Sequence, residues 1–416
     1  YQRMGADIQA WYGGEHTVTG NTFTKGARSV YGNDVDLFVS ENTWYDYTQY
    51  GALVVEGALT FENNLFSGSS GHLFACVRGT VSARRTETRD TVVGSDRYDE
   101  IYVDGVLVNE ISQPYAYPSV YTEECDTDIE TLTFTDTAAL AALFKGGTHT
   151  LNEVAVLRPN SGGYYTNAAI EFYDSWTRST SVGTETVIEA THASLSNITI
   201  SETGFGGGIT HIGDRDGGTE FASSIQIGNA TMTDVGSHGV FAQDVLASIS
   251  NTNINAPSGS GIIVNEGSLV VTGGLVDRAF GYGLELIQTD STIEGLTVQN
   301  NYYDGIYALG GSLTAVANNL KLNQGSGFHL SAVTASLIEN SITDNAVYGL
   351  ICGDSTFLAC DNSFFGNGSG PTDSCDSECL DVPPIEDSSE PDTGIHEADE
   401  GDTGDPAAVD TATIDA

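Results

Sequence analysis

The chain has 416 residues, of which 49 are glycine, and a formal net charge of −43 at pH 7. So large an excess of acid repels the phosphates of nucleic acids, and we expect no nucleic-acid partner. No apolar stretch approaches the roughly 18 residues that a membrane span needs, so we expect no membrane insertion. Frequent glycine, asparagine, serine and threonine favour many tight turns over long helices.

The cysteines are even in number, and none forms a Cys-x-x-Cys pair that would indicate zinc or redox chemistry. They are Cys76, Cys125, Cys352, Cys360, Cys375 and Cys379. We expect them to form disulfides, with the pairing left open, and we expect an extracellular or cell-surface location.

The first segment, residues 1–75, shows a weak repeat. Asn21-Thr-Phe23, Asn42-Thr-Trp44 and Asn63-Asn-Leu65 follow one another at a constant interval. We expect coils of a solenoid here. Because the repeat already operates at Asn21, little room remains for the cap that a solenoid end needs, and we expect further sequence upstream.

The period disappears in residues 76–185, where we expect a β-rich insertion. Residues 98–108 alternate in polarity around Asp104-Gly105, which predicts a hairpin. Residues 138–151 faintly resemble part of a galactose-binding-like jelly roll, and the alternative is an irregular β insertion on the flank of the solenoid. Acidic residues interleave its arginines, which predicts local salt bridges rather than a docking site for an anionic glycan. These arginines are Arg78, Arg84, Arg85, Arg89 and Arg97.

A strict repeat with a period of about 22 residues governs residues 186–380. A glycine precedes an apolar residue in each period, at Gly239-Val240, Gly261-Ile262, Gly283-Leu284, Gly305-Ile306, Gly327-Phe328 and Gly349-Leu350. A second column runs Met232, Ile254, Val276, Val298, Leu320, Ile342 and Phe364, and a third runs Ile227, Ile249, Val271, Ile293, Val316, Ile338 and Cys360. Three columns predict three inward faces, so each coil should be a triangle of short strands that pair in parallel with neighbouring coils.

A row of turn residues accompanies the third column. It reads Asn229, Asn251, Gly273, Gly295, Asn318, Asn340 and Asn362. Asparagine and glycine tolerate left-handed backbone angles, and stacked asparagine amides can hydrogen-bond between coils. We therefore expect a structural ladder here and no catalytic role.

Asn340-Ser-Ile342 followed by Tyr348-Gly349-Leu350-Ile351 resembles the repeats of the right-handed β-helix, or pectin-lyase-like, superfamily, and the resemblance covers residues 186–370. It implies an all-β fold, a right-handed parallel β-helix solenoid with coils of about 22 residues. That superfamily includes polysaccharide lyases, glycoside hydrolases, phage tailspikes and non-enzymatic surface proteins. The resemblance therefore leaves the activity and the oligomeric state open.

The C-terminal part of the repeat region should be a disulfide-stapled cap, because Cys375 and Cys379 follow the last coil. Cys352 and Cys360 sit on apolar columns of that coil. Beyond it, residues 381–416 contain 12 acidic residues and neither lysine nor arginine. That segment cannot bury a core, and we expect a disordered acidic tail.

A functional site on such a solenoid should be a column, because outward side chains of adjacent coils line up. Two residues after each repeat glycine stand Phe241, Ile263, Glu285, Tyr307, His329 and Ile351. Our catalytic candidates are Glu285, Tyr307 and His329, with Asp304 in the adjoining turn, since acid, phenol and imidazole suit acid–base work. Tyr282, Phe241 and Tyr307 are candidates for binding substrate, because aromatic rings suit the apolar faces of sugars. The alternative is an ordinary solvated β face.

One coil, between Gly208 and Gly239, is longer than the others. Its extra residues include Asp214, Asp216 and Glu220, which alternate with glycine as in part of a calcium loop. They form either a Ca²⁺ site or an acidic surface turn. We expect no cofactor to be required.

Two functions stay open. The leading prediction is a secreted or cell-surface module that binds a polysaccharide, a cell-surface glycan or a neighbouring surface, adhesin-like or structural, without catalysis. The alternative is a polysaccharide-degrading lyase or glycoside hydrolase that acts on the outer face. A pectate-type lyase would need acidic calcium ligands beside a basic residue, and Arg215, Arg278 and Lys321 join no acidic column. A flat face would count against catalysis, because enzymes of this fold build grooves from long loops.

Overall fold

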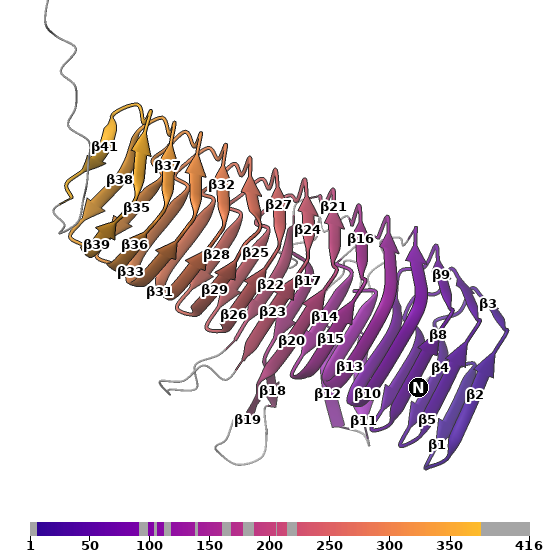
Figure 1. Ribbon diagram of the computed structural model, residues 1–416. Coiled ribbons are helices and arrows are strands. Elements are labelled where there is room, and N and C mark those ends of the chain that lie inside the picture. Colours follow the sequence, from indigo (N-terminus) through magenta and orange to yellow (C-terminus); the bar gives the residue numbers. More distant parts are fainter. Residues whose placement is uncertain are drawn as a thin grey trace, which may run out of the picture. The chain divides into compact units, whose positions relative to one another are not determined.

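The computed structural model shows a right-handed parallel β-helix of about 14 turns (Figure 1), which confirms the predicted fold class. It describes residues 6–90, 99–103, 106–111, 118–137, 140–159, 168–177, 187–204, 206–213 and 223–375. Within these ranges every regular element is a β-strand, and no helix long and apolar enough to cross a membrane occurs. The predicted acidic tail at 381–416 lies outside the described residues.

Each coil contributes a strand to three faces, here named A, B and C in chain order. Face A consists of β1 (Ile8–Trp11), β4 (Arg28–Asn33), β7 (Tyr50–Val55), β14 (Ala142–Lys145), β17 (Ala168–Tyr173), β22 (Gly207–Ile212), β25 (Val240–Gln243), β28 (Ile262–Asn265), β35 (Phe328–Ser331), β38 (Tyr348–Gly353) and β41 (Gly370–Asp373), and of parts of four longer strands. Of these longer strands, β10 (His72–Arg89) and β13 (Val120–Thr135) bend through all three faces, and β31 (Leu284–Glu294) and β33 (Ile306–Val316) bend through A and B.

Face B adds β2 (Glu15–Thr19), β5 (Asp36–Ser40), β8 (Ala58–Glu62), β15 (Gly147–Asn152), β20 (Thr191–Ser196), β23 (Ser224–Gly228), β26 (Leu246–Ser250), β29 (Ser268–Thr272), β36 (Thr334–Ile338) and β39 (Thr356–Cys360). Face C adds β3 (Thr22–Thr24), β6 (Thr43–Tyr45), β9 (Leu65–Ser67), β16 (Ala155–Leu157), β21 (Thr199–Ser201), β24 (Thr231–Thr233), β27 (Asn253–Asn255), β30 (Leu275–Asp277), β32 (Thr297–Gln299), β34 (Asn319–Lys321), β37 (Ser341–Thr343) and β40 (Ser363–Phe365).

The apolar columns form one continuous core. Val240 pairs in parallel with Ile262, and Ile262 with Leu284, and all three side chains are buried. The repeat glycine is required by this packing, because a Cβ at Gly283 would lie 2.2 Å from Cγ1 of Val298 and 2.4 Å from the carbonyl oxygen of Gly305. No coil buries its apolar side chains alone, so stability comes from stacking.

The third predicted column and its turn row are wrong by one residue in their last three members. Ala315 of β33, Leu337 of β36 and Ala359 of β39 are buried, whereas the next residues, Val316, Ile338 and Cys360, are half-buried. Because strand side chains alternate between faces, a slip of one residue exchanges inside for outside.

The predicted insertion at 76–185 needs correction in its described part, because most of that part belongs to the β-helix. Strands β10, β13, β14, β15, β16 and β17 pair in parallel with each other and with the coils on either side. They do not form a jelly roll. The predicted hairpin corresponds to the antiparallel pair β11 (Asp99–Val103) and β12 (Val106–Ile111), and a second pair joins β18 (Ser175–Thr177) to β19 (Val187–Glu189).

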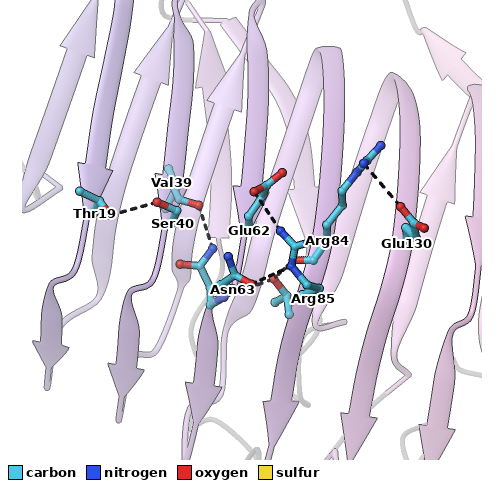
Figure 2. A network of polar contacts seen from close by, with 10 residues as sticks. Thr19, Val39, Ser40, Glu62, Asn63, Arg84, Arg85 and Glu130 are labelled. Atoms are coloured by element: carbon cyan, nitrogen blue, oxygen red, sulfur yellow. Dashed lines mark hydrogen bonds and ion pairs between the residues drawn. The ribbon is translucent and has the colours of Figure 1, made fainter.

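Four arginines of this region, Arg78, Arg84, Arg85 and Arg89, make local ion pairs, as expected, and Arg97 lies outside the described residues. Arg78 lies 2.7 Å from Glu56. Arg84 lies 3.5 Å from Glu130 and Arg85 lies 3.4 Å from Glu62, and each acid belongs to a neighbouring coil. Figure 2 shows both contacts.

Two disulfides staple coils together. One joins Cys76 to Cys125, and the other joins Cys352 to Cys375 after the last described coil. Cys379, the remaining cysteine of the predicted cap, lies outside the described residues.

Candidate functional site

The predicted outer column exists as a register of paired residues on face A. Glu285 of β31 pairs with Tyr307 of β33, and Tyr307 pairs with His329 of β35. All three side chains are half-buried on the outer surface. Backbone pairing therefore holds the acid, the phenol and the imidazole about 4.8 Å apart along the solenoid.

Aromatic rings gather beside this column, where the chain passes from face C to face A. Tyr282 stacks on Tyr307 with ring centroids 4.9 Å apart, and Tyr303 lies 5.3 Å from Tyr282. Phe280 stacks on Tyr302 at 4.8 Å, because the two occupy equivalent positions of adjacent coils. We call these five residues the aromatic platform. Phe280, Tyr302 and Tyr303 are 62%, 45% and 49% exposed, so their ring faces meet solvent.

Asp304 holds the imidazole of His329 against the platform. Its Oδ2 lies 3.2 Å from Nδ1 of His329, and its Oδ1 accepts a hydrogen bond of 2.5 Å from the Ser326 amide. The His329 ring meets Tyr307 edge to face at 5.2 Å. This Asp–His pair remains partly open to solvent, with 14% of the Asp304 side chain and 34% of the His329 side chain exposed.

Glu285 is fixed from the preceding coil. The Ser260 hydroxyl donates to Oε2 of Glu285 at 3.0 Å, and the Ser260 amide donates to Nδ1 of His238 at 3.1 Å. Burial lowers the pKa of His238, and the Glu285 carboxylate opposes that effect. Burial raises the pKa of Tyr282, and the charges of Asp304 and Glu285 raise it further, so both carboxylates act on one phenol.

The structure brings together five of the predicted residues: Tyr282, Glu285, Asp304, Tyr307 and His329. Phe241 belongs to the same column but is separated from Glu285 by the coil of Ile263, whose side chain is 6% exposed. Sequence reasoning missed the exposed rings of the platform, Phe280, Tyr302 and Tyr303. Phe280 and Tyr302 each stand three positions before a repeat glycine, and this shared place in the repeat is a signal that would have found two of them.

The predicted calcium ligands Asp214, Asp216 and Glu220 lie outside the described residues. Within the described ranges, no three His, Cys, Asp or Glu side chains gather as metal ligands would.

Comparison with known proteins agrees with this fold. A model of the right-handed β-helix region matches residues 218–372. No curated protein sequence matches the chain.

Among solved structures, a mutant of a periplasmic alginate epimerase is similar at 11% identity, with 78% of this chain and 77% of that chain covered and a TM-score of 0.49. The A-module of a mannuronan C-5 epimerase from Azotobacter vinelandii is similar at 13% identity, with 72% and 90% covered and a TM-score of 0.47. The catalytic domain of an α-1,3-glucanase follows at 7% identity, with 82% and 64% covered and a TM-score of 0.36. At these identities the likeness is one of fold.

Proposed function

We propose that the protein binds a polysaccharide along the outer surface of face A, with the aromatic platform as its main contact. The observation that carries this proposal is the pair of stacked, solvent-facing rings Phe280 and Tyr302 beside the Tyr282–Tyr307 stack. Exposed aromatic clusters of this size are unusual on a soluble surface and mark interaction sites.

The polar groups at the platform's edge suit sugar hydroxyls. Rings present apolar faces to the pyranose, while Glu285 and Asp304 accept hydrogen bonds from hydroxyl groups. Both carboxylates are already oriented, by Ser260 and by the Ser326 amide, so little ordering is needed on binding.

We also propose an extracellular or cell-envelope location for the protein. The two disulfides require an oxidising compartment to form and persist. A glycan on or outside the cell surface is then the accessible partner.

A second candidate function, cleavage or modification of the bound polysaccharide, is favoured by the Asp304–His329 pair. A partly exposed imidazole held by a carboxylate beside an aromatic contact surface can transfer protons to a bound sugar. The regularity of the coils opposes catalysis at the platform. From Val240 to Leu350, a segment described without a gap, successive coils follow one another at one constant interval, and no long connection walls a groove.

Retention on immobilised glycans tests the binding proposal. We expect the wild type to be retained on at least one member of a panel of neutral and acidic polysaccharides. Tyr307→Ala and Tyr302→Ala should weaken the association by about tenfold each, from lost stacking and lost apolar contact. Tyr45→Ala is the matched control, because Tyr45 is 41% exposed on face C, away from the platform. Equal loss in the control, or no retention of the wild type, contradicts the proposal.

Release of reducing ends and of unsaturated products from the retained glycans tests the second candidate. His329→Ala and Asp304→Asn should abolish release if the platform is catalytic. Retention with undiminished release in both variants removes catalysis from the platform.

A further inference from the structure

The outer surface of face A carries a second group of ionisable side chains, five to seven coils away from Tyr307. The column of Tyr307 and Glu285 continues through Phe241 and Thr210 to Glu171, Leu143 and Tyr121. The next outward column carries Glu123, Lys145 and Tyr173 on three consecutive coils. We call Tyr121, Glu123, Lys145, Glu171 and Tyr173 the polar centre.

Contacts join the members of the polar centre in two pairs. The Tyr121 hydroxyl donates to Oε2 of Glu123 at 2.7 Å, and the Tyr173 hydroxyl donates to Oε2 of Glu171 at 3.0 Å. Lys145 stands on the coil between these pairs, and its ammonium group lies over the Tyr121 ring, 5.5 Å from the ring centroid. Tyr121 and Glu171 are 1% and 3% exposed, whereas Glu123, Lys145 and Tyr173 are half-buried and reach solvent.

This arrangement differs from an ordinary solvated face. Burial raises the pKa of Glu123, which holds its carboxyl group in the acid form to higher pH than usual, although Tyr121 and Lys145 oppose the shift. Burial and Glu171 raise the pKa of Tyr173. A carboxyl group whose pKa is raised by burial, beside a lysine and hydrogen-bonded to a buried tyrosine, is an arrangement typical of proton-donating sites.

The connections between coils are also longest here. Phe74 pairs with Val120, Ala142 with Ile170, and Ile170 with Ile209, so more chain separates each of these partners than separates Val240 from Ile262 in the regular coils. In the chain, the extra residues stand between a face C strand and the next face A strand before β13 and before β17. After β17 they stand between that face A strand and the next face B strand, β20. They lie mostly outside the described residues. The regular coils at the platform have no such additional chain.

We propose that the polar centre is a hydrolytic site for the polysaccharide that the platform binds, with Glu123 as its general acid. This inference rests on the proposed function for its substrate. The carboxylic acid of Glu123 gives its proton to the glycosidic oxygen as the bond from that oxygen to the anomeric carbon breaks. A water oxygen forms the new bond to that carbon, the proton lost by the water goes to solvent, and Glu123 takes a proton back from solvent. Water is the only co-reactant.

The neighbours of Glu123 have supporting roles. Tyr121 positions the carboxyl through its hydrogen bond, and Lys145 offers its ammonium group to sugar oxygens on the next coil. Glu171 positions the Tyr173 hydroxyl in the same way.

The distance between the two regions sets the size of the substrate. Seven coil steps of about 4.8 Å place the coil of Glu123 roughly 34 Å from that of Tyr307 along the solenoid. One extended chain that contacts both Glu123 and Tyr307 must be at least that long. Oligosaccharides too short to span it should be cleaved with a higher KM than the polymer, and their KM should not respond to Tyr307→Ala.

The test compares Glu123→Gln with Glu130→Gln, two substitutions of the same type in β13. Glu130 lies on face B, where it pairs with Arg84 (Figure 2). Full-length proteins are assayed for reducing-end release from laminarin, xylan, chitosan, alginate and polygalacturonate, and for retention on the same glycans. We expect Glu123→Gln to lower release by about 100-fold or more with unchanged retention. Glu130→Gln should behave as the wild type.

Two further measurements distinguish a loss of catalysis from misfolding of the variant. Each variant is melted, and Tyr121→Phe, which removes only the hydroxyl, should shift the alkaline limb of the pH–rate profile without loss of retention. Because an acid must be protonated to act, release should fall as pH rises through the raised pKa of Glu123.

The outcomes separate this proposal from the preceding one. Release by Glu123→Gln within about threefold of the wild type overturns the hydrolytic site, as does a wild type that is retained on a glycan but cleaves none. Release without retention, insensitive to the platform variants, overturns the platform and leaves the polar centre standing. A wild type that is neither retained on any of the glycans nor releases reducing ends from them contradicts both proposals.

Discussion

His149 and His211 lie in the interior of the solenoid as uncharged rings. His149 is held by Thr127 and by the Gly146 carbonyl, while His211 packs against Phe172 with ring centroids 5.7 Å apart. Burial is the main cause that lowers the pKa of His149 to about 4 and that of His211 to about 3. Neither ring nitrogen of His211 has a hydrogen-bond partner among the described residues, so a proton there has no acceptor.

Acid should therefore destabilise the fold before most carboxylates are protonated. In the unfolded chain a histidine is protonated below about pH 6.5, whereas in the folded protein His149 is protonated only below about pH 4 and His211 only below about pH 3. The free energy of unfolding therefore falls as pH drops from about 6.5 to these values. At pH 5, His211 alone should contribute a loss of about 2 kcal/mol. His211→Phe should reduce the difference in Tm between pH 7.5 and pH 5, and the exposed His16→Phe should not. An unchanged difference in His211→Phe would contradict this account.

At the scale of single elements, asparagine ladders connect consecutive coils at two corners. At one, Asn318 donates its amide and its side-chain NH₂ to Oδ1 of Asn340, 2.9 and 3.0 Å away, and Asn340 repeats the pattern with Asn362. At the other corner, the equivalent ladder runs through Asn301, Asn323, Asn345 and Asn367. Each amide thus satisfies backbone groups that a sharp turn leaves without a strand partner.

Asn340→Ala should destabilise the protein by about 2–4 kcal/mol, because it leaves buried donors of Asn318 and the carbonyl of Ala315 without partners. Asn253→Ala is the matched control, since Asn253 is exposed on β27 and should change stability by less than about 0.5 kcal/mol. Chemical denaturation of both variants measures the difference. Equal effects would mean that the ladder does not stabilise the coils.

The ladders also show which features of the fold could be predicted from the sequence and which could not. The repeat placed Asn318, Asn340 and Asn362 in one row with Asn229 and Gly273, yet the left-handed position of that row passes through Ala317, Glu339 and Asp361. The asparagines stand one residue later, in the buried position. Composition could not reveal this slip, because small and polar residues suit both positions. Only the pairing of Val316 with Ile338, on the outer side of face B, settles it.

For the whole molecule, the period was visible only where coils follow each other directly. The long connections between Phe74 and Val120 and between Ile170 and Ile209 interrupt the periodicity without interrupting the stack. A solenoid tolerates such lengthening, because added chain at a corner leaves the strand pairing of both neighbours intact. The platform lay within the regular coils and was partly foreseen, whereas the polar centre lay among the interrupted coils and was missed.

Charge acts on the whole solenoid at once. Residues 1–380 hold 45 of the 57 acidic residues and all 14 lysines and arginines, so self-repulsion opposes the compact state and is screened by salt. The screening length falls from about 30 Å at 0.01 M to about 10 Å at 0.1 M ionic strength, so Tm should rise by several degrees over that range. CaCl₂ at matched ionic strength separates screening from specific binding at Asp214, Asp216 and Glu220. Equal Tm values in the two salts mean screening alone, and a higher Tm in CaCl₂ that chelator reverses means a bound Ca²⁺. A Tm that does not change with NaCl would show that the acidic side chains are too far apart, or already too well screened, to weaken the fold.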